Sequence, residues 1–106
     1  MAWVSLIIAG GLEVVWAALM KQSDGFTRLW PSIGTIAFMI GSFGLLSWSM
    51  RTLPLGTAYM VWTGIGAVGA FVVGVILYGE PLNPMRVTAA AMLLGGMVLM
   101  KLSSPA

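Results

Sequence analysis

Glu13 is an acidic residue inside an otherwise apolar stretch, GGLEVVWAALM, which runs from Gly10 to Met20. An ionised carboxylate in such surroundings is costly, so it needs a positive partner or a proton. A side chain of this type at this place therefore predicts a site that holds either a proton or a cation. The alternative is a protonated glutamic acid that only hydrogen-bonds a neighbouring helix.

The helical neighbours of Glu13 predict a pocket beside its carboxyl group. Positions three and four residues away share a helix face, and here they hold Ala9, Gly10, Trp16 and Ala17. Trp16 would also suit an anchor at a membrane surface, but it lies about one turn inside the expected helix end. We therefore expect Trp16 to contact the ligand, and Gly10 and Ala17 to line the pocket.

A second group of polar side chains lies in the stretch LGTAYMVWTGIGAVGA, which begins at Leu55. Tyr59, Trp62, Thr63 and Gly66 share one helix face, at offsets of three, four and seven residues. Tyrosine and tryptophan each combine an apolar ring with a polar tip, so a face that points only to lipid is the less economical interpretation. We expect Tyr59 and Trp62 to donate toward Glu13 and to orient its carboxylate.

Ser42, Gly64 and Gly66 each allow two interpretations. The Ser42 hydroxyl lies near the middle of its apolar stretch. It would donate a hydrogen bond either to a carbonyl of its own helix or to Glu13. Glycines in membrane helices usually allow close packing of a neighbour. Their density just after Trp62 also permits a kink, and a kinked helix is a plausible hinge.

The composition indicates an all-α membrane protein. Of the 106 residues, 59% are hydrophobic and 8% are charged. Four apolar stretches, 2–20, 29–50, 55–78 and 85–101, each come near the roughly 20 residues that a bilayer requires of a helix. We expect residues 1–106 to form one domain of four transmembrane helices.

Several classes of site are excluded by the residues present. The chain has neither cysteine nor histidine, so thiolate metal sites, cysteine nucleophiles and imidazole bases are absent. We predict no metal, no cofactor and no enzymatic activity. The net charge of +2 is spread singly along the chain, which gives no electrostatic footprint for nucleic acid. Glu80, in a loop flanked by prolines, is expected to be solvated.

The short connections predict an up-and-down bundle with both termini on one side of the membrane. Lys21, Arg28 and Arg86 then lie on one side and Arg51 and Lys101 on the other, so the positive charges nearly balance. The positive-inside rule gives almost no preferred orientation, which suggests a chain that inserts both ways up.

Four short helices fill their own interior with side chains, so they cannot enclose a substrate and also open to two sides. We therefore expect an oligomer. Many transporters bind substrate between inverted repeats, but no internal repeat is visible in this chain. A homodimer of oppositely oriented copies would supply the inversion, and it would bring two Glu13 carboxylates to one shared site.

The motifs GFTRLWPS and LPLGTAYMVWTGIGAVG, together with Glu13 in the first helix, resemble the small multidrug resistance family over essentially the full chain. The resemblance implies a multi-pass protein of the bacterial inner (plasma) membrane. It also implies an antiparallel, dual-topology homodimer that exchanges protons for cations. By the same resemblance, Glu13 binds proton and substrate, surrounded by Ser42, Tyr59 and Trp62, and the fourth helix forms the dimer contact through Ala89, Leu93 and Gly96.

Within that family, EVVWA, Gly10, Met39 and Lys101 resemble the guanidinium-exporter subtype. The drug-exporting subtype usually has a small residue in place of Trp16 and a tyrosine in place of Met39. Met39 is therefore expected to line the pocket. Ala89 departs from many relatives, which have glycine there.

The subtype also has a physical interpretation. Guanidinium is planar, its paired N–H donors fit a carboxylate, and an indole ring stacks on its face. A quaternary ammonium ion has no N–H donor and would bind mainly through aromatic and apolar contact. Multidrug efflux of such lipophilic cations is the first alternative function. A non-transporting membrane assembly or chaperone-like subunit is the second.

Overall fold

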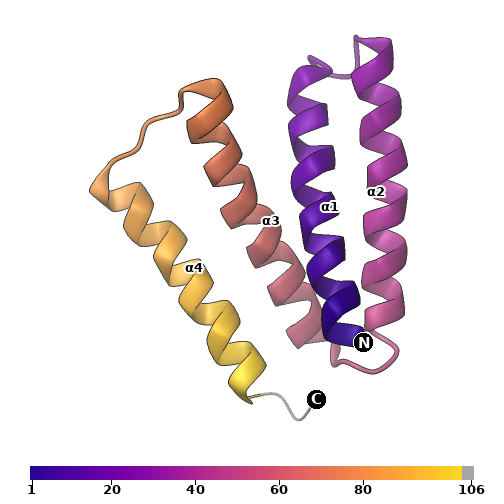
Figure 1. Ribbon diagram of the computed structural model, residues 1–106, viewed down its shortest axis with the longest axis vertical. Coiled ribbons are helices and arrows are strands. Elements are labelled where there is room, and N and C mark those ends of the chain that lie inside the picture. The colour runs from indigo at the N-terminus through magenta and orange to yellow at the C-terminus, as the bar shows by residue number, and fades with distance from the viewer. Residues whose placement is uncertain (104–106) are drawn as a thin grey trace.

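The computed structural model of the chain describes residues 1–103 and consists of four helices joined by short loops (Figure 1). They are α1 (Ala2–Gln22), α2 (Leu29–Ser49), α3 (Leu55–Tyr78) and α4 (Pro84–Ser103). Each is long and apolar enough to cross a membrane. The expectation of an all-α protein with four membrane-spanning helices is confirmed.

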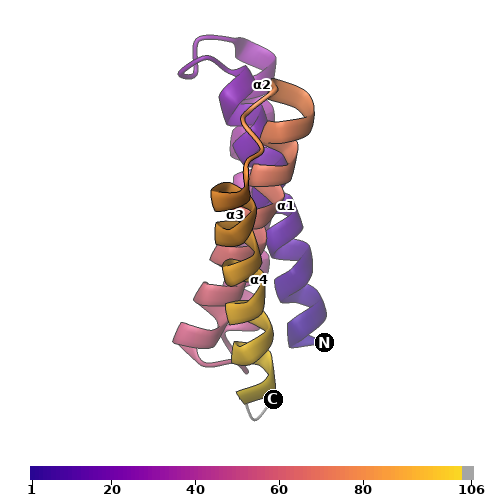
Figure 2. The same cartoon turned by 90° about the vertical axis from the view of Figure 1, so that its left-hand side faces the viewer.

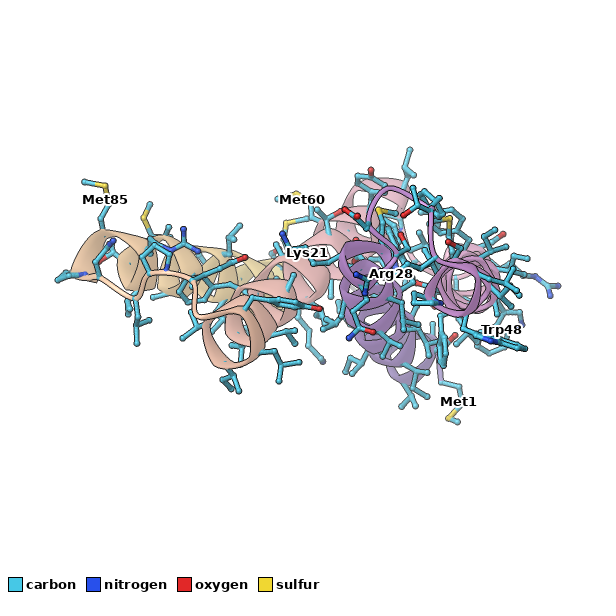
Figure 3. The ribbon with its side chains drawn as sticks, turned by 90° about the horizontal axis from the view of Figure 1, so that it is seen from above. Met1, Lys21, Arg28, Trp48, Met60 and Met85 are labelled. Atoms are coloured by element: carbon cyan, nitrogen blue, oxygen red, sulfur yellow. The ribbon has the colours of Figure 1, made fainter. Side chains whose placement is uncertain are left out.

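The four helices form a single layer rather than a closed bundle. Across the layer they follow the order α4, α3, α1, α2, and the molecule measures 43 × 34 × 16 Å (Figures 1 and 2). Seen from above, Met85 of α4 and Trp48 of α2 mark its two edges (Figure 3). Because one helix with its side chains is about 10–12 Å across, a layer this thin leaves both faces of α1 and α3 near the surface.

The helix ends follow local hydrogen bonds and turn chemistry. α1 ends at Gln22 rather than at residue 20, since Lys21 can extend its ammonium group to the membrane surface while the main chain stays helical. α3 ends at Tyr78 and is capped by Gly79, whose φ of 62° is the left-handed conformation that glycine adopts most easily. The side-chain oxygen of Asn83 accepts the Arg86 main-chain N–H at 2.9 Å, which caps the first turn of α4.

Serine hydroxyls fix the register of α1 against α2. Three of them donate across the seam to main-chain carbonyl oxygens of the opposite helix: Ser5 to Leu45 (3.2 Å), Ser42 to Ala9 (2.7 Å) and Ser49 to Ala2 (3.2 Å). In lipid no water competes for these groups, and small hydroxyl residues also let the helices approach closely. These bonds hold α2 along the length of α1 from Ala2 to Ala9.

Small residues line the seam between α1 and α3. The side chain of Val14 packs directly on Gly69, where an added Cβ would overlap it. Toward the other end of the seam, Ile65 packs on Gly10, where a Cβ would lie 2.7 Å from two Ile65 carbons. The absence of side chains at these positions therefore lets α1 and α3 touch.

Helix α4 is the most loosely attached element. None of its residues, Pro84–Ser103, is buried, and it packs mainly against α3. Its far end also reaches α1, where the Lys101 ammonium lies 4.9 Å from the centre of the Trp3 ring. Most of the α4 surface is thus left for lipid or for another protein.

The α1–α3 seam predicts opposite effects for two similar substitutions. Gly69→Ala should destabilise the protein by about 1–3 kcal/mol, because its Cβ overlaps Val14. Gly11→Ala is the matched control, since nothing lies within 4 Å of its Cβ and alanine favours a helix more than glycine does. Thermal unfolding in detergent should show a lower midpoint for Gly69→Ala only. Equal midpoints would contradict this description of the seam.

Candidate cation-binding site

Glu13 lies near the middle of α1, and its half-buried side chain packs on Gly66 of α3. A Cβ at position 66 would overlap the carboxyl oxygen Oε1, so glycine is what makes room for the acid. This oxygen is buried and has no hydrogen-bond partner within residues 1–103. A buried acceptor without a protein donor is costly, and such groups are found where a ligand or proton binds.

Trp16 lies one turn after Glu13 on the same helix. Its indole Nε1–H is also buried and also lacks a partner within the described residues 1–103. Its ring meets that of Phe43 edge-on, with centroids 6.1 Å apart and an interplanar angle of 78°. The site therefore holds an unsatisfied acceptor, an unsatisfied donor and an aromatic ring within one turn of α1.

Phe43 continues an aromatic row across three helices. Its ring centroid lies 5.6 Å from that of Trp62, which in turn lies 5.6 Å from that of Tyr59. Aromatic pairs at such spacing contribute about 0.5–1.5 kcal/mol beyond the area they bury. Phe43 was not among the residues expected at the site. Its position four residues after Met39, on the same face of α2, is the signal that could have indicated it.

Trp62 and Ser42 form a buried relay that ends on the main chain of α1. The Trp62 Nε1–H donates to Ser42 Oγ at 3.0 Å, and the Ser42 hydroxyl donates to the Ala9 carbonyl at 2.7 Å. In an α-helix the same carbonyl accepts the N–H of the residue four positions later, here Glu13. The relay therefore braces the Glu13 main chain and leaves its Oε1 unoccupied.

This relay differs from the expected role of its members. The Ser42 hydroxyl bonds neither a carbonyl of its own helix nor Glu13, but a carbonyl of the opposite helix. The indole N–H of Trp62 serves Ser42 and not the carboxylate. Since the carboxyl side chain points to Gly66 on α3, the relay reaches Glu13 only through the main chain.

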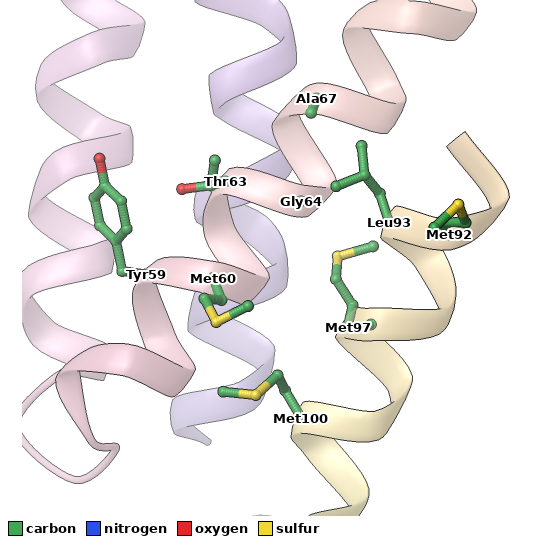
Figure 4. Close-up of a pocket in the computed structure, with 10 residues that line it drawn as sticks. Tyr59, Met60, Thr63, Gly64, Ala67, Met92, Leu93, Met97 and Met100 are labelled. Atoms are coloured by element: carbon green, nitrogen blue, oxygen red, sulfur yellow. The ribbon is translucent and has the colours of Figure 1, made fainter. Parts of the chain in front are cut away.

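Tyr59 lies at the edge of the aromatic row, with 52% of its surface exposed. It also borders an apolar groove of about 400 Å³ between α3 and α4 (Figure 4). Gly64 faces the same groove and packs on Met97 of α4. Gly64 and Gly66 thus each receive a side chain from a neighbouring helix, which is the packing role that we weighed against a kink.

The other expected residues are distributed over the layer. Gly10 is covered by Ile65, and Ala17 lines a cavity of about 150 Å³ between α1 and α3. Met39 is half-buried on α2. The residues expected at a dimer contact stand apart from the site, on α4: Ala89, Leu93 and Gly96, all in grooves that face α3.

The model of the family described as Small Multidrug Resistance protein matches residues 1–94. The chain belongs to this family. A relative from Citrobacter freundii named guanidinium exporter is 57% identical over 104 residues, which cover 98% of this chain and 99% of the relative. A relative of the same name from Escherichia coli (strain K12) is 54% identical with the same coverage. The chain is therefore a multi-pass membrane transporter of a bacterial family, not an enzyme.

In this small multidrug resistance protein the polar residues of the site come from three helices. Glu13 and Trp16 belong to α1, Ser42 to α2 and Trp62 to α3. Because α1 lies between α2 and α3, only the central helix can place its acid beside both neighbours. The order of the helices across the layer thus determines which residues meet.

The Trp62–Ser42 hydrogen bond can be tested with a double-mutant cycle. Ser42→Ala should cost about 1–3 kcal/mol, since it leaves the buried Trp62 N–H without an acceptor. Trp62→Phe removes the same bond, so the two substitutions should show a coupling energy of about 0.5–1.5 kcal/mol in unfolding experiments. The cycle of Ser5→Ala with Trp62→Phe should show no coupling, because Ser5 bonds Leu45 instead. Strict additivity of the Ser42 and Trp62 effects would contradict the relay.

Proposed function

We propose that this protein exports guanidinium in exchange for protons, with Glu13 binding either the cation or a proton. The observation that carries the proposal is the buried Glu13 Oε1, which has no hydrogen-bond partner within residues 1–103. A membrane-embedded acid with this environment is best explained as a binding site. The names of the relatives, which are guanidinium exporters at 54–57% identity, support the same substrate.

The shape and chemistry of guanidinium suit this environment. Its N–H groups donate to carboxylate oxygens, and its flat face stacks on an aromatic ring. Glu13 offers the oxygen, and Trp16 offers a ring one turn away. A quaternary ammonium ion would leave Oε1 without a donor, which makes multidrug efflux the weaker alternative.

Competition at one carboxyl group couples the two ions. A proton and a guanidinium ion both neutralise Glu13, so binding of one favours release of the other. The Trp62–Ser42 relay supports this exchange because it fixes the α1 main chain without using Oε1. The helix can thus hold its shape while the carboxyl group changes partner.

The transporting unit that we propose is an antiparallel homodimer. A layer 16 Å thick leaves both faces of α1 near the surface, so a second copy could cover the half-buried side chain of Glu13. Helix α4 has no buried residue, so its surface is available for the dimer contact, including Ala89, Leu93 and Gly96. An antiparallel homodimer requires that the chain insert in both orientations. Since the positive charges at the two ends of the layer nearly balance, neither orientation is strongly preferred.

Transport is tested in proteoliposomes loaded with a pH-sensitive dye. A guanidinium gradient should drive proton movement in the opposite direction, and Glu13→Gln should abolish it, because the amide binds neither ion. A tetramethylammonium gradient of equal size is run in parallel and should move few protons. Proton flux with tetramethylammonium alone would favour drug efflux. Lack of flux with both cations, or guanidinium flux that survives in Glu13→Gln, would refute the proposal.

Dual topology is tested with introduced cysteines, since the chain has none of its own. Thr27→Cys lies in the α1–α2 loop and Thr52→Cys in the α2–α3 loop, at opposite ends of the layer. In whole cells an impermeant maleimide should label about half of each variant, because both orientations are nearly equally favoured. Full labelling of one variant and none of the other would exclude an antiparallel homodimer.

A further inference from the structure

Arg86, in the first turn of α4, has a guanidinium group held between a carboxylate and an aromatic ring. Its Nη2 lies 3.6 Å from Glu80 Oε1, and its central carbon lies 5.2 Å from the centre of the Phe71 ring. Its Nε is buried without a hydrogen-bond partner within residues 1–103. The guanidinium group of Arg86 is thus in contact with an acid and an aromatic ring, at a place remote from Glu13 in sequence.

The Glu80 carboxylate is held in place by the end of α3. Its side chain packs on Gly74, where a Cβ would overlap Oε1, and its main-chain N–H donates to the Gly74 carbonyl at 3.1 Å. The left-handed Gly79 turns the chain back so that both contacts can form. Glu80 is therefore part of a built turn, while its side chain stays 42% exposed, as expected of a solvated loop residue.

Arg86 is held only loosely by Glu80 and Phe71. The 3.6 Å separation is longer than a charge-assisted hydrogen bond, which measures about 2.7–2.9 Å. The two side chains are 38% and 42% exposed, and ion pairs this exposed contribute little. A cation in the first turn of a helix is also opposed by the helix dipole. A competing cation of the same chemistry therefore has little to displace.

We propose that Glu80 and Phe71 form a second guanidinium-binding site, which Arg86 fills from within the chain and which a free guanidinium ion can occupy in its place. The ligand class comes from the Arg86 head group itself, so the proposal stands independently of the function assigned to Glu13. Binding of the free ion would release the first turn of α4 from the end of α3.

Nearby charge limits the affinity of this second site. Lys21 lines the same 150 Å³ cavity as Glu80, and its ammonium group lies 5.9 Å from the centre of the Tyr78 ring. Its positive charge opposes a second cation, so binding is weak and depends on the planar N–H donors of guanidinium. Tetramethylammonium, which has no such donors, should not bind.

The test uses the full chain carrying Glu13→Gln, which removes the first site, in lipid nanodiscs. Guanidinium chloride is titrated at constant ionic strength, and the amide resonances of Gly79 and Glu80 are followed by NMR. They should shift saturably. Adding Arg86→Ala should tighten the apparent Kd by roughly two- to sixfold, because a weak internal competitor is gone. Arg51→Ala, at the opposite end of the layer, is the matched control and should leave the Kd unchanged.

Further variants separate binding from general salt effects. Glu80→Gln, added to the Glu13→Gln, Arg86→Ala protein, should abolish the saturable shift, and Phe71→Leu should weaken binding. If Arg86→Ala fails to fold, Arg86→Lys replaces it, and it should bind guanidinium more tightly than the Arg86 protein because lysine lacks the planar fork. An equal shift with tetramethylammonium, a shift that survives Glu80→Gln, or no saturable shift would overturn the proposal. None of these outcomes bears on Glu13.

Discussion

The structure depends on one constraint: a carboxyl group in the middle of α1 must be kept in apolar surroundings, with no hydrogen-bond partner for Oε1 among residues 1–103. A buried donor nearby would tend to satisfy that oxygen, and the fold directs two of them, Trp62 and Ser42, to other acceptors. Trp62 donates to Ser42, and Ser42 donates to the Ala9 carbonyl. This relay therefore ends on the α1 main chain and not on the carboxyl group. The carboxyl group itself rests on Gly66, which offers no side chain.

The single-layer arrangement follows from the kinds of seam that the sequence allows. Serine hydroxyls hold α2 on one side of α1, and glycines let α3 approach on the other. Apolar side chains also pack between these helices, with Leu6 of α1, Leu46 of α2 and Val61 of α3 buried. Helix α4 packs mainly on α3, where Met97 lies against Gly64, and Arg86 over Phe71 and Lys101 over Trp3 add contacts near its two ends.

The sequence was sufficient for the helices, but not for the contacts among the residues expected at the site. Four long apolar stretches predict four helices because a membrane leaves few other structures. Polar groups inside a membrane helix are costly without a partner. This cost is why the sequence indicates Glu13, Trp16, Ser42 and Trp62 as candidates. The partner of Ser42 could not be identified, since the choice between its own helix, Glu13 and Ala9 depends on the register of α1 against α2. The contact of Glu80 with Gly74 could not be predicted for a related reason, because it depends on how the turn at Gly79 packs in three dimensions.

The central claim is that guanidinium and a proton exchange at the same carboxyl group. The most direct measurement is proton release during guanidinium binding to the purified protein in weakly buffered detergent solution. We expect the pH to fall as guanidinium saturates the wild-type protein, and Glu13→Gln to release no protons. Saturable guanidinium binding to the wild-type protein without proton release, at every pH tested, would contradict it.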